Sequence, residues 1–365
     1  MIITELPFFF KSHPLPDNGG YPHVLPFNIY FDEELKMFRQ QATPELKNIL
    51  KQVYEAGSLV DGSISSESGK EYVPFLLDYI KKHATFNDKI DVLEVGCGTG
   101  LILKKLKEDT LGNNYCGIEP GNHPIVEGLR GVNIIKDFFP SLKLQQKFDL
   151  VYSFCVLEHL EDPINFIENI YNQLTEKGIM IFGVPNCEPF YREGDLSMFY
   201  NEHFSYFTKQ SIVALSQKLN LSILDISEIK GMLVFAISNS EVKGFQYELF
   251  TKEDYFKKLD IHFNSLKQLF SRYNNDETVV YIPGRALNTF FLLNMKDVRL
   301  VDDNTEMYKR YLPYFSNPVS NLEDILSNPP KLMFIYSRTF GNKIKEKCLL
   351  YPQLKETIIF TIDEL

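Results

Sequence analysis

Short apolar runs alternate with longer segments of helical periodicity over residues 89–184. Apolar runs of this length are typical of strands that are buried on both faces of a parallel sheet. Their alternation with helices predicts a doubly wound α/β sheet. The five runs are IDVLEV, NYCGIE, VNIIKD, FDLVYSF and GIMIFGV, and LSILDI and MLVFAI follow as two further strands at one edge.

A second α/β pattern follows a long helical segment. Between Tyr247 and Asn274 the apolar residues recur at threes and fours, which predicts one amphipathic helix that bridges two domains. After it the strand–loop–helix pattern restarts with VVYIPG, a helix over residues 286–294, VRLVDD, LMFIYS and TIIFTI. We interpret this part as a smaller Rossmann-like domain, and a length of 365 residues also favours two domains.

The predicted organisation has four segments. Residues 1–45, rich in Pro, Gly and aromatic residues, form an irregular N-terminal lead-in, and residues 46–240 form the first α/β domain. Residues 241–275 are the linking helix, and residues 276–365 are the C-terminal Rossmann-like domain. Within the first domain, a Gly/Ser stretch over residues 57–72 interrupts the helical pattern.

Composition and charge restrict the possible partners. The chain is 44% hydrophobic and 24% charged, which is the balance of a soluble globular protein. A net charge of −10 would repel a phosphate backbone, and no stripe of Lys and Arg is interleaved with aromatic residues, so we exclude nucleic acid as a partner. The N-terminus lacks a basic region and a cleavage site, and no run approaches 18 apolar residues. We therefore expect a cytoplasmic protein without membrane contact.

The cysteines give no sign of a disulfide framework or a metal site. They stand singly, without a CxxC pair or a histidine at ligand spacing, so we predict no bound metal. The five positions are Cys97, Cys116, Cys155, Cys187 and Cys348.

A glycine-rich loop follows the first predicted strand, in the segment IDVLEVGCGTG. Glycine permits the tight turn and lets a ligand approach the backbone, while the next helix presents its free amides. The pattern is GxGxG, whereas the dinucleotide fingerprint GxGxxG would need Gly in place of Leu101. The residues that we assign to the cofactor here are Glu94, Gly96, Gly98 and Gly100.

The next three strands end in residues that suit an adenosyl ligand. Glu119 ends the second strand, where a carboxylate can accept both ribose hydroxyls. Asp137 ends the third strand and can accept the adenine amine, while Phe138 packs on the ring. From Phe154 to His159, the end of the fourth strand would run past the methionine portion.

Together these motifs resemble the class I S-adenosylmethionine-dependent methyltransferase core. The resemblance covers residues 89–184 and consists of EVGCGTG, Glu119, Asp137 and the segment VLEHLEDP. It implies that S-adenosylmethionine is the cofactor and that residues 46–240 are the methyltransferase domain. The substrate stays open at this point.

Ionisable side chains gather ahead of the helix that is predicted near Thr208. A histidine beside a carboxylate can act as a general base near neutral pH, although a polar helix-capping segment is the alternative. The segment YNEH, which contains Tyr200, Glu202 and His203, resembles the Y-H-E-H segment of sugar C-methyltransferases that act on nucleotide-linked ketosugars. Those enzymes also carry a second Rossmann-like domain.

This second resemblance implies C-methylation of a nucleotide-linked ketosugar. It implies His203 as the base, with Tyr200 and Glu202 stabilising the enolate and orienting the base. Two features depart from the family: Asn201 replaces its first histidine, and the N-terminal cysteine zinc domain is absent. An O- or N-methyltransferase that acts on a sugar or another small metabolite is therefore the alternative.

Two other classes of function, and two roles for the second domain, stay open. A NAD-dependent sugar oxidoreductase fits two Rossmann-like units but not the GxGxG loop. A non-catalytic module that binds S-adenosylmethionine or a nucleotide sugar fits less well with a base beside the loop. In the second domain, Gly284, Arg285 and Asn288 precede a helix and could hold an anion such as a diphosphate, or the domain is purely structural.

Overall fold

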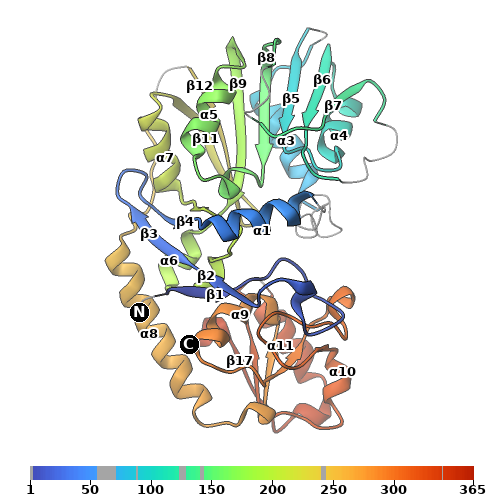
Figure 1. Ribbon diagram of the computed structural model, residues 1–365, viewed down its shortest axis with the longest axis vertical. Helices are drawn as coiled ribbons and strands as arrows, with labels where there is room; N and C mark the ends of the chain where they lie inside the picture. The colour runs from blue at the N-terminus through green and yellow to red at the C-terminus, as the bar shows by residue number, and fades with distance from the viewer. Residues whose placement is uncertain are drawn as a thin grey trace. The chain divides into compact units, whose positions relative to one another are not determined.

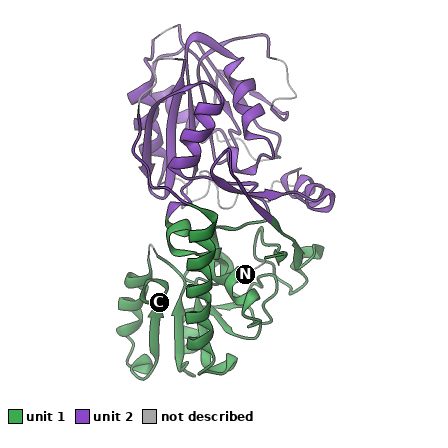
Figure 2. Ribbon diagram, turned by 90° about the vertical axis from the view of Figure 1, so that its left-hand side faces the viewer, with its two compact units in different colours: residues 1–28, 189–201, 251–365 green, residues 29–188, 202–250 purple. Residues whose placement is uncertain are grey.

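The computed structural model describes residues 3–55, 71–87, 89–122, 129–139, 144–239, 244–338 and 340–365. It divides into two compact units, shown in Figure 2. Unit 1 comprises Met1–Asn28, Pro189–Asn201 and Thr251–Leu365, and unit 2 comprises Ile29–Glu188 and Glu202–Phe250. The predicted domain boundaries stay a prediction. Most of the predicted Gly/Ser stretch lies outside the described residues.

Unit 2 is built on a seven-stranded sheet with the order β11-β12-β9-β8-β5-β6-β7 (Figure 1). Five neighbouring strands, from β9 to β7, are parallel, and β12 pairs antiparallel with both β9 and β11. Each strand overlaps one of the apolar runs, so the predicted fold class is confirmed. The bounds are β5 (Asp91–Val95), β6 (Asn114–Ile118), β7 (Val132–Ile135), β8 (Phe148–Phe154), β9 (Leu174–Pro185), β11 (Ser222–Ile229) and β12 (Met232–Ser238).

Helices cover both faces of this sheet. One core joins the sheet to α3 and α4, and the other joins it to α5 and α7. Neighbouring strand residues such as Val92 and Leu93 belong to opposite cores, because side chains alternate between the faces of a strand. The helices are α1 (Pro44–Glu55), α3 (Val73–His83), α4 (Leu101–Asp109), α5 (Pro163–Tyr171) and α7 (Lys209–Lys218).

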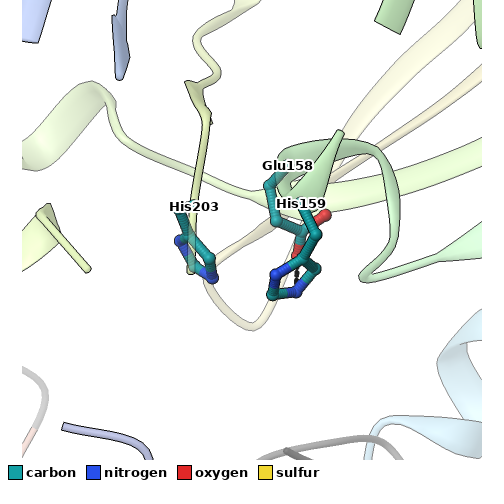
Figure 3. A group of neighbouring side chains, drawn as sticks. All are labelled: Glu158, His159 and His203. Atoms are coloured by element: carbon teal, nitrogen blue, oxygen red, sulfur yellow. Dashed lines mark ion pairs between the residues drawn. The ribbon is translucent and has the colours of Figure 1, made fainter. Parts of the chain in front are cut away.

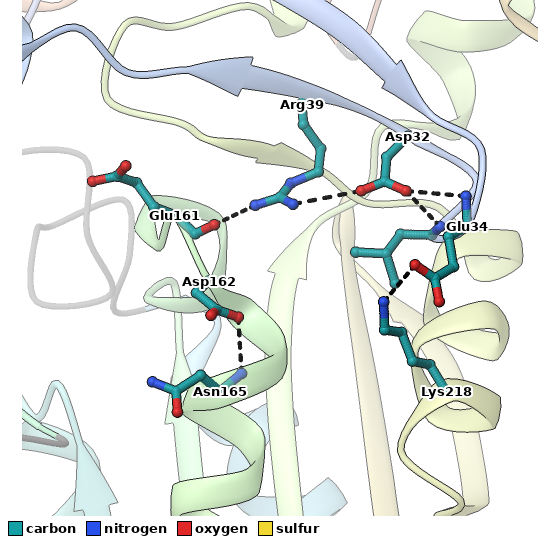
Figure 4. Close-up of polar contacts among 8 residues, drawn as sticks. Asp32, Glu34, Arg39, Glu161, Asp162, Asn165 and Lys218 are labelled. Atoms are coloured by element: carbon teal, nitrogen blue, oxygen red, sulfur yellow. Dashed lines mark hydrogen bonds and ion pairs between the residues drawn. The ribbon is translucent and has the colours of Figure 1, made fainter.

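A hairpin from the N-terminal part of the chain extends unit 2. Strands β3 (Asn28–Asp32), β4 (Met37–Gln41) and β10 (Ser205–Tyr206) form a sheet with the order β10-β4-β3. Figure 4 shows that Arg39 of β4 pairs with Asp32 and donates to the carbonyl of Glu161, while Lys218 pairs with Glu34 at 2.5 Å. The segment predicted to be irregular thus contains strands. Its partner β10 lies far along the chain, so no local pattern indicated the pairing.

Unit 1 contains a five-stranded parallel sheet with the order β15-β14-β13-β16-β17. Helix α9 begins at Pro283, where the missing N–H costs nothing, three residues before the predicted start. The strands are β13 (Thr278–Tyr281), β14 (Arg299–Val301), β15 (Val319–Ser320), β16 (Leu332–Ile335) and β17 (Ile358–Thr361), with β1 (Glu5–Pro7) and β2 (Val24–Pro26) as a separate antiparallel pair. The helices are α8 (Lys252–Phe270), α9 (Pro283–Leu292), α10 (Leu322–Ile325) and α11 (Gly341–Leu349), and α6 (Glu188–Glu193) begins at the unit boundary.

Two cores and one buried carboxylate hold unit 1 together. Helices α8 and α9 contribute to the core on one face of the sheet, and α10 and α11 to the core on the other. Asp195 is 1% exposed and accepts hydrogen bonds from the Tyr336 hydroxyl at 3.0 Å and from Nε of Arg338 at 3.1 Å. This network ties the segment 189–201 to the C-terminal sheet.

Candidate active site

The glycine loop after β5 is forced into a left-handed backbone. Gly96, Gly98 and Gly100 have φ angles of 77°, 52° and 78°, which residues with a Cβ rarely adopt. A Cβ on Gly96 would lie 2.3 Å from Cγ2 of Val156. The loop therefore needs glycine both for its turn and for its close packing against the chain that follows β8.

A cavity of about 280 Å³ lies beside this loop. It is at the carboxyl ends of β5, β6 and β8, where open α/β sheets bind their ligands. Seven predicted cofactor residues line it: Glu94, Gly96, Gly98, Glu119, Phe138, Phe154 and His159. Two do not: Gly100 is the N-cap of α4, and Asp137 is half-buried and accepts the N–H of Phe138 at 2.7 Å.

Two buried carboxyl groups face the cavity. Glu119 accepts the N–H of Gly98 at 2.9 Å and that of Gly121 at 2.7 Å, which orients its carboxylate at the end of β6. Burial raises the pKa of Glu94 well above its ordinary value, and a hydrogen bond from the Tyr152 hydroxyl partly offsets this effect. A strand-end carboxylate, a glycine loop and the aromatic Phe138 fit the ribose, the backbone contacts and the adenine of an adenosyl ligand.

Glu119→Ala is expected to weaken binding of S-adenosylhomocysteine by about 1 to 3 kcal/mol, because charge-assisted hydrogen bonds to the ribose are lost. Asp137→Ala is expected to weaken it less, since that side chain does not line the cavity. Isothermal titration calorimetry of both variants checks the difference. Equal losses would contradict the roles assigned to the two carboxylates.

A cluster of ionisable groups lies next to the cavity, with His159 belonging to both. Glu158 and His159 belong to the 3₁₀ helix η3 (Leu157–His159), and His203 precedes β10 (Figure 3). Nδ1 of His159 donates to the carbonyl of Glu202 at 3.0 Å, so its Nε2 carries the lone pair, 3.8 Å from Oε1 of Glu158. Burial lowers the pKa of His159 to about 4, and the ring is neutral at physiological pH.

His203 lies between an imidazole and a carboxyl group. Its ring centroid is 4.8 Å from that of His159, with the planes at 81°, and its Nε2 is 4.0 Å from Oε1 of Glu202. Burial raises the pKa of Glu202 and of Glu158 to about 8, so both are uncharged acids at neutral pH. The N–H of Phe204 donates to the carbonyl of Glu158 at 2.7 Å, which fixes the two segments side by side.

Tyr54 of α1 is a site residue that sequence reasoning missed. It lines the cavity, and its ring meets that of His159 edge-on at 6.0 Å. Its buried hydroxyl has no hydrogen-bond partner among the residues that the structure describes. Burial, followed by the nearby carboxyl groups of Glu202 and Glu158, raises its pKa well above the ordinary value. No local sequence signal separates Tyr54 from an ordinary aromatic residue of an amphipathic helix.

Tyr200, the third predicted catalytic residue, belongs to unit 1, whereas Glu202 and His203 belong to unit 2. Its hydroxyl accepts a hydrogen bond from Nη1 of Arg285 at 3.2 Å. The catalytic role predicted for Tyr200 stays a prediction.

The ionisable cluster also has the composition of a cation site. Glu158, His159 and His203 each offer one ligand atom, and these atoms lie within 4.8 Å of one another. Two imidazoles and a carboxylate form a donor set that zinc accepts. The sequence predicted that no metal is bound, and this stays a prediction. Treatment with a chelator tests it.

The raised pKa of Glu158 predicts a pH dependence of stability. Above pH 4.5 the unfolded chain releases a proton that the folded chain keeps up to about pH 8, so stability falls across this range. The amide of Glu158→Gln cannot ionise. We therefore expect the free energy of unfolding to fall between pH 5 and pH 9 by about 2 to 4 kcal/mol less in this variant than in the wild type. Urea unfolding without ligand measures the difference. Exposed Glu228→Gln is the control, and equal pH slopes for Glu158→Gln and the wild type would refute the prediction.

Comparisons with known proteins indicate the class of the domain. Residues 70–226 match the family model described as a methyltransferase domain. The ubiquinone biosynthesis O-methyltransferase of Rickettsia bellii is 27% identical over 175 residues, which cover 44% of this chain and 71% of that protein. The enzyme of the same name from Nitrosospira multiformis is 30% identical over 128 residues, 33% of this chain and 52% of that one.

Solved structures of other methyltransferases are more distant. The N-methyltransferase NodS from Bradyrhizobium japonicum WM9 in complex with S-adenosyl-l-homocysteine shares 17% identity, over 55% of this chain and 100% of that one, with a TM-score of 0.40. A likeness of this degree adds nothing to the assignment. Among the described residues, no helix combines the length and the apolar character that a membrane crossing requires.

The family match, the strand order and the glycine loop define the class. Residues 70–226 are a class I S-adenosylmethionine-dependent methyltransferase domain. The chain is therefore an enzyme that uses S-adenosylmethionine, and the predicted enzyme class and cofactor are confirmed. The oxidoreductase and the non-catalytic binding module are set aside.

Proposed function

We propose that this enzyme methylates a carbon atom of a nucleotide-linked ketosugar, with His203 as the general base. The observation that carries the proposal is the position of His203 in a buried cluster beside the cofactor cavity, 4.0 Å from a carboxyl oxygen of Glu202. An imidazole next to a second ionisable group is the usual arrangement of a general base near neutral pH.

Each group then has a defined part in the reaction. Nε2 of His203 accepts the proton alpha to the ketone, and the electron pair of that C–H bond moves toward the carbonyl to form an enolate. Glu202 is an uncharged acid at neutral pH and donates a hydrogen bond to the developing enolate oxygen. Bound S-adenosylmethionine supplies the electrophilic methyl group. The electron pair of the enolate forms the new bond between the alpha carbon and this methyl group, which restores the ketone, while the S–CH3 bond breaks and its electron pair stays on the sulfur of S-adenosylhomocysteine.

O-methylation is the second candidate, and the names of the relatives favour it. The matched enzymes from Rickettsia bellii and Nitrosospira multiformis are O-methyltransferases. In that reaction His203 would remove a hydroxyl proton, and no enolate would form.

Exchange of the acceptor's alpha proton with deuterated water separates the two candidates. The wild-type enzyme is incubated with a panel of ketosugar nucleotides and S-adenosylhomocysteine, so that methyl transfer cannot occur. If the enzyme methylates carbon, we expect exchange at one alpha position of the acceptor. When S-adenosylmethionine is added in place of S-adenosylhomocysteine, the acceptor should gain the mass of one methyl group. Turnover without exchange, on an acceptor that gains its methyl group at oxygen or nitrogen, would leave the second candidate.

A further inference from the structure

A small cavity of unit 1 lies at the N-terminus of α9. Its volume is about 10 Å³, which is room for one water-sized atom. Asn201, Gly284 and Arg285 are among the residues that line it, and none of the described lining residues is acidic. The cavity therefore accepts a single oxygen atom, with the rest of a ligand at its mouth.

The amide of Asn201 requires such an oxygen. This side chain is 3% exposed, and its Nδ2 has no hydrogen-bond partner among the residues that the structure describes. A buried N–H group without an acceptor destabilises the folded chain, and a ligand oxygen that accepts its hydrogen bond removes this cost. Asn288, on the same cavity, is different: its Nδ2 donates to the carbonyls of Leu196 at 3.1 Å and Phe199 at 2.7 Å. Asn288 thus fixes the backbone that precedes Tyr200 and is not available to a ligand.

The charges around the cavity favour an anion. Arg285 is exposed, and its Nη1 donates to the Tyr200 hydroxyl at 3.2 Å, so the guanidinium is held at the mouth. Gly284 is the second residue of α9, where a backbone N–H has no acceptor within the helix. The N-terminus of a helix also carries a partial positive charge. A cation, an unpaired amide and a helix N-terminus thus point to one negatively charged oxygen.

We propose that this cavity binds a phosphoryl oxygen of the acceptor, with Asn201 and Arg285 as its ligands. The proposal rests on the proposed function insofar as the phosphoryl group belongs to a nucleotide-linked sugar.

Calorimetric titration of the full chain tests the site without any methyl transfer. The probes are inorganic phosphate, inorganic pyrophosphate, UDP and uridine, each added with saturating S-adenosylhomocysteine so that the cofactor cavity is filled. We expect pyrophosphate and UDP to bind one per chain, and uridine to bind much more weakly. Arg285→Ala should weaken UDP binding about ten- to a hundredfold, and Asn201→Ala about three- to tenfold. Arg272→Ala removes the same charge from an exposed position of unit 1 and should change nothing.

Thermal unfolding of each variant shows that it is folded. Binding of UDP that is equal in wild type, Arg285→Ala and Arg272→Ala would overturn the proposal, as would the absence of saturable binding by every phosphate probe. If phosphate and pyrophosphate bind and UDP binds no more tightly than pyrophosphate, the phosphoryl site is supported and a nucleotide as its ligand is rejected. Because no acceptor is methylated in this assay, failure of the carbon-methylation proposal would leave its result unchanged.

Discussion

His203→Ala is expected to lower turnover by about two to four orders of magnitude while leaving cofactor binding nearly unchanged. This range is the usual contribution of a positioned general base. His203 does not line the cofactor cavity, whereas His159 does, so removal of the imidazole should affect the proton transfer and not the binding of S-adenosylhomocysteine. Steady-state kinetics and calorimetry on the same preparation measure the two effects, and the variant should also lose exchange of the alpha proton.

Two further experiments distinguish a general base from other roles of His203. His23→Ala, a half-buried histidine of unit 1, is the control for the loss of an imidazole as such. Treatment with EDTA addresses the cluster of Glu158, His159 and His203: a base needs no metal, so wild-type turnover should survive the chelator. Turnover that vanishes with EDTA and returns with zinc would show that His203 is a metal ligand. Turnover of His203→Ala within tenfold of the wild type would also remove its role as the base.

Gly96→Val is expected to weaken binding of S-adenosylhomocysteine by more than about a hundredfold, or about 3 kcal/mol. The substituted residue would have to keep a φ of 77°, and its Cβ would lie 2.3 Å from Val156. The loop must therefore move, and Gly98, whose N–H is bonded to Glu119, moves with it. Gly98→Val should act in the same direction. Calorimetry measures the affinity, and unfolding in urea measures the stability.

Gly231→Val is a closely matched control for this experiment. Gly231 lies in the turn between β11 and β12 with a φ of 82°, but a Cβ there meets nothing within 4 Å. Both variants carry the strain of a left-handed backbone, about 1 to 2 kcal/mol, and only Gly96→Val adds the clash with Val156. If Gly96→Val is folded and binds S-adenosylhomocysteine as Gly231→Val does, the cofactor lies elsewhere.

Local sequence was enough to predict that most of the proposed cofactor residues lie at one cavity, while their role in binding the cofactor stays a prediction. The loop from Gly96 to Gly100 and Glu119 follow directly after buried strands, and the carboxyl ends of neighbouring parallel strands meet at one edge of a sheet. Strand periodicity and spacing therefore sufficed to bring seven of the nine predicted residues to one cavity. Asp137 was assigned by the same reasoning, but it does not line the cavity, because its carboxylate accepts the N–H of Phe138, and its role stays a prediction.

The acceptor side depended on contacts between distant segments. Tyr54, the pair Glu158–His159 and His203 come from three separate parts of the chain, and the pairing of β4 with β10 holds the last of them. The sequence pointed to His203 through the segment YNEH. It did not show which side chains lie next to His203, nor the burial that raises the pKa of Glu202 and keeps it an uncharged acid.

The sequence by itself determined the two α/β sheets, the glycine loop and the cofactor class, because apolar periodicity and short motifs act over a few residues. Only the tertiary structure decided that residues 189–201 belong to the same unit as the C-terminal sheet, where burial of Asp195 requires Tyr336 and Arg338 as partners. It also decided which polar groups are buried together, namely the Glu158 cluster in unit 2 and the amide of Asn201 in unit 1. A buried polar group is satisfied or unsatisfied only by what the whole chain brings to it.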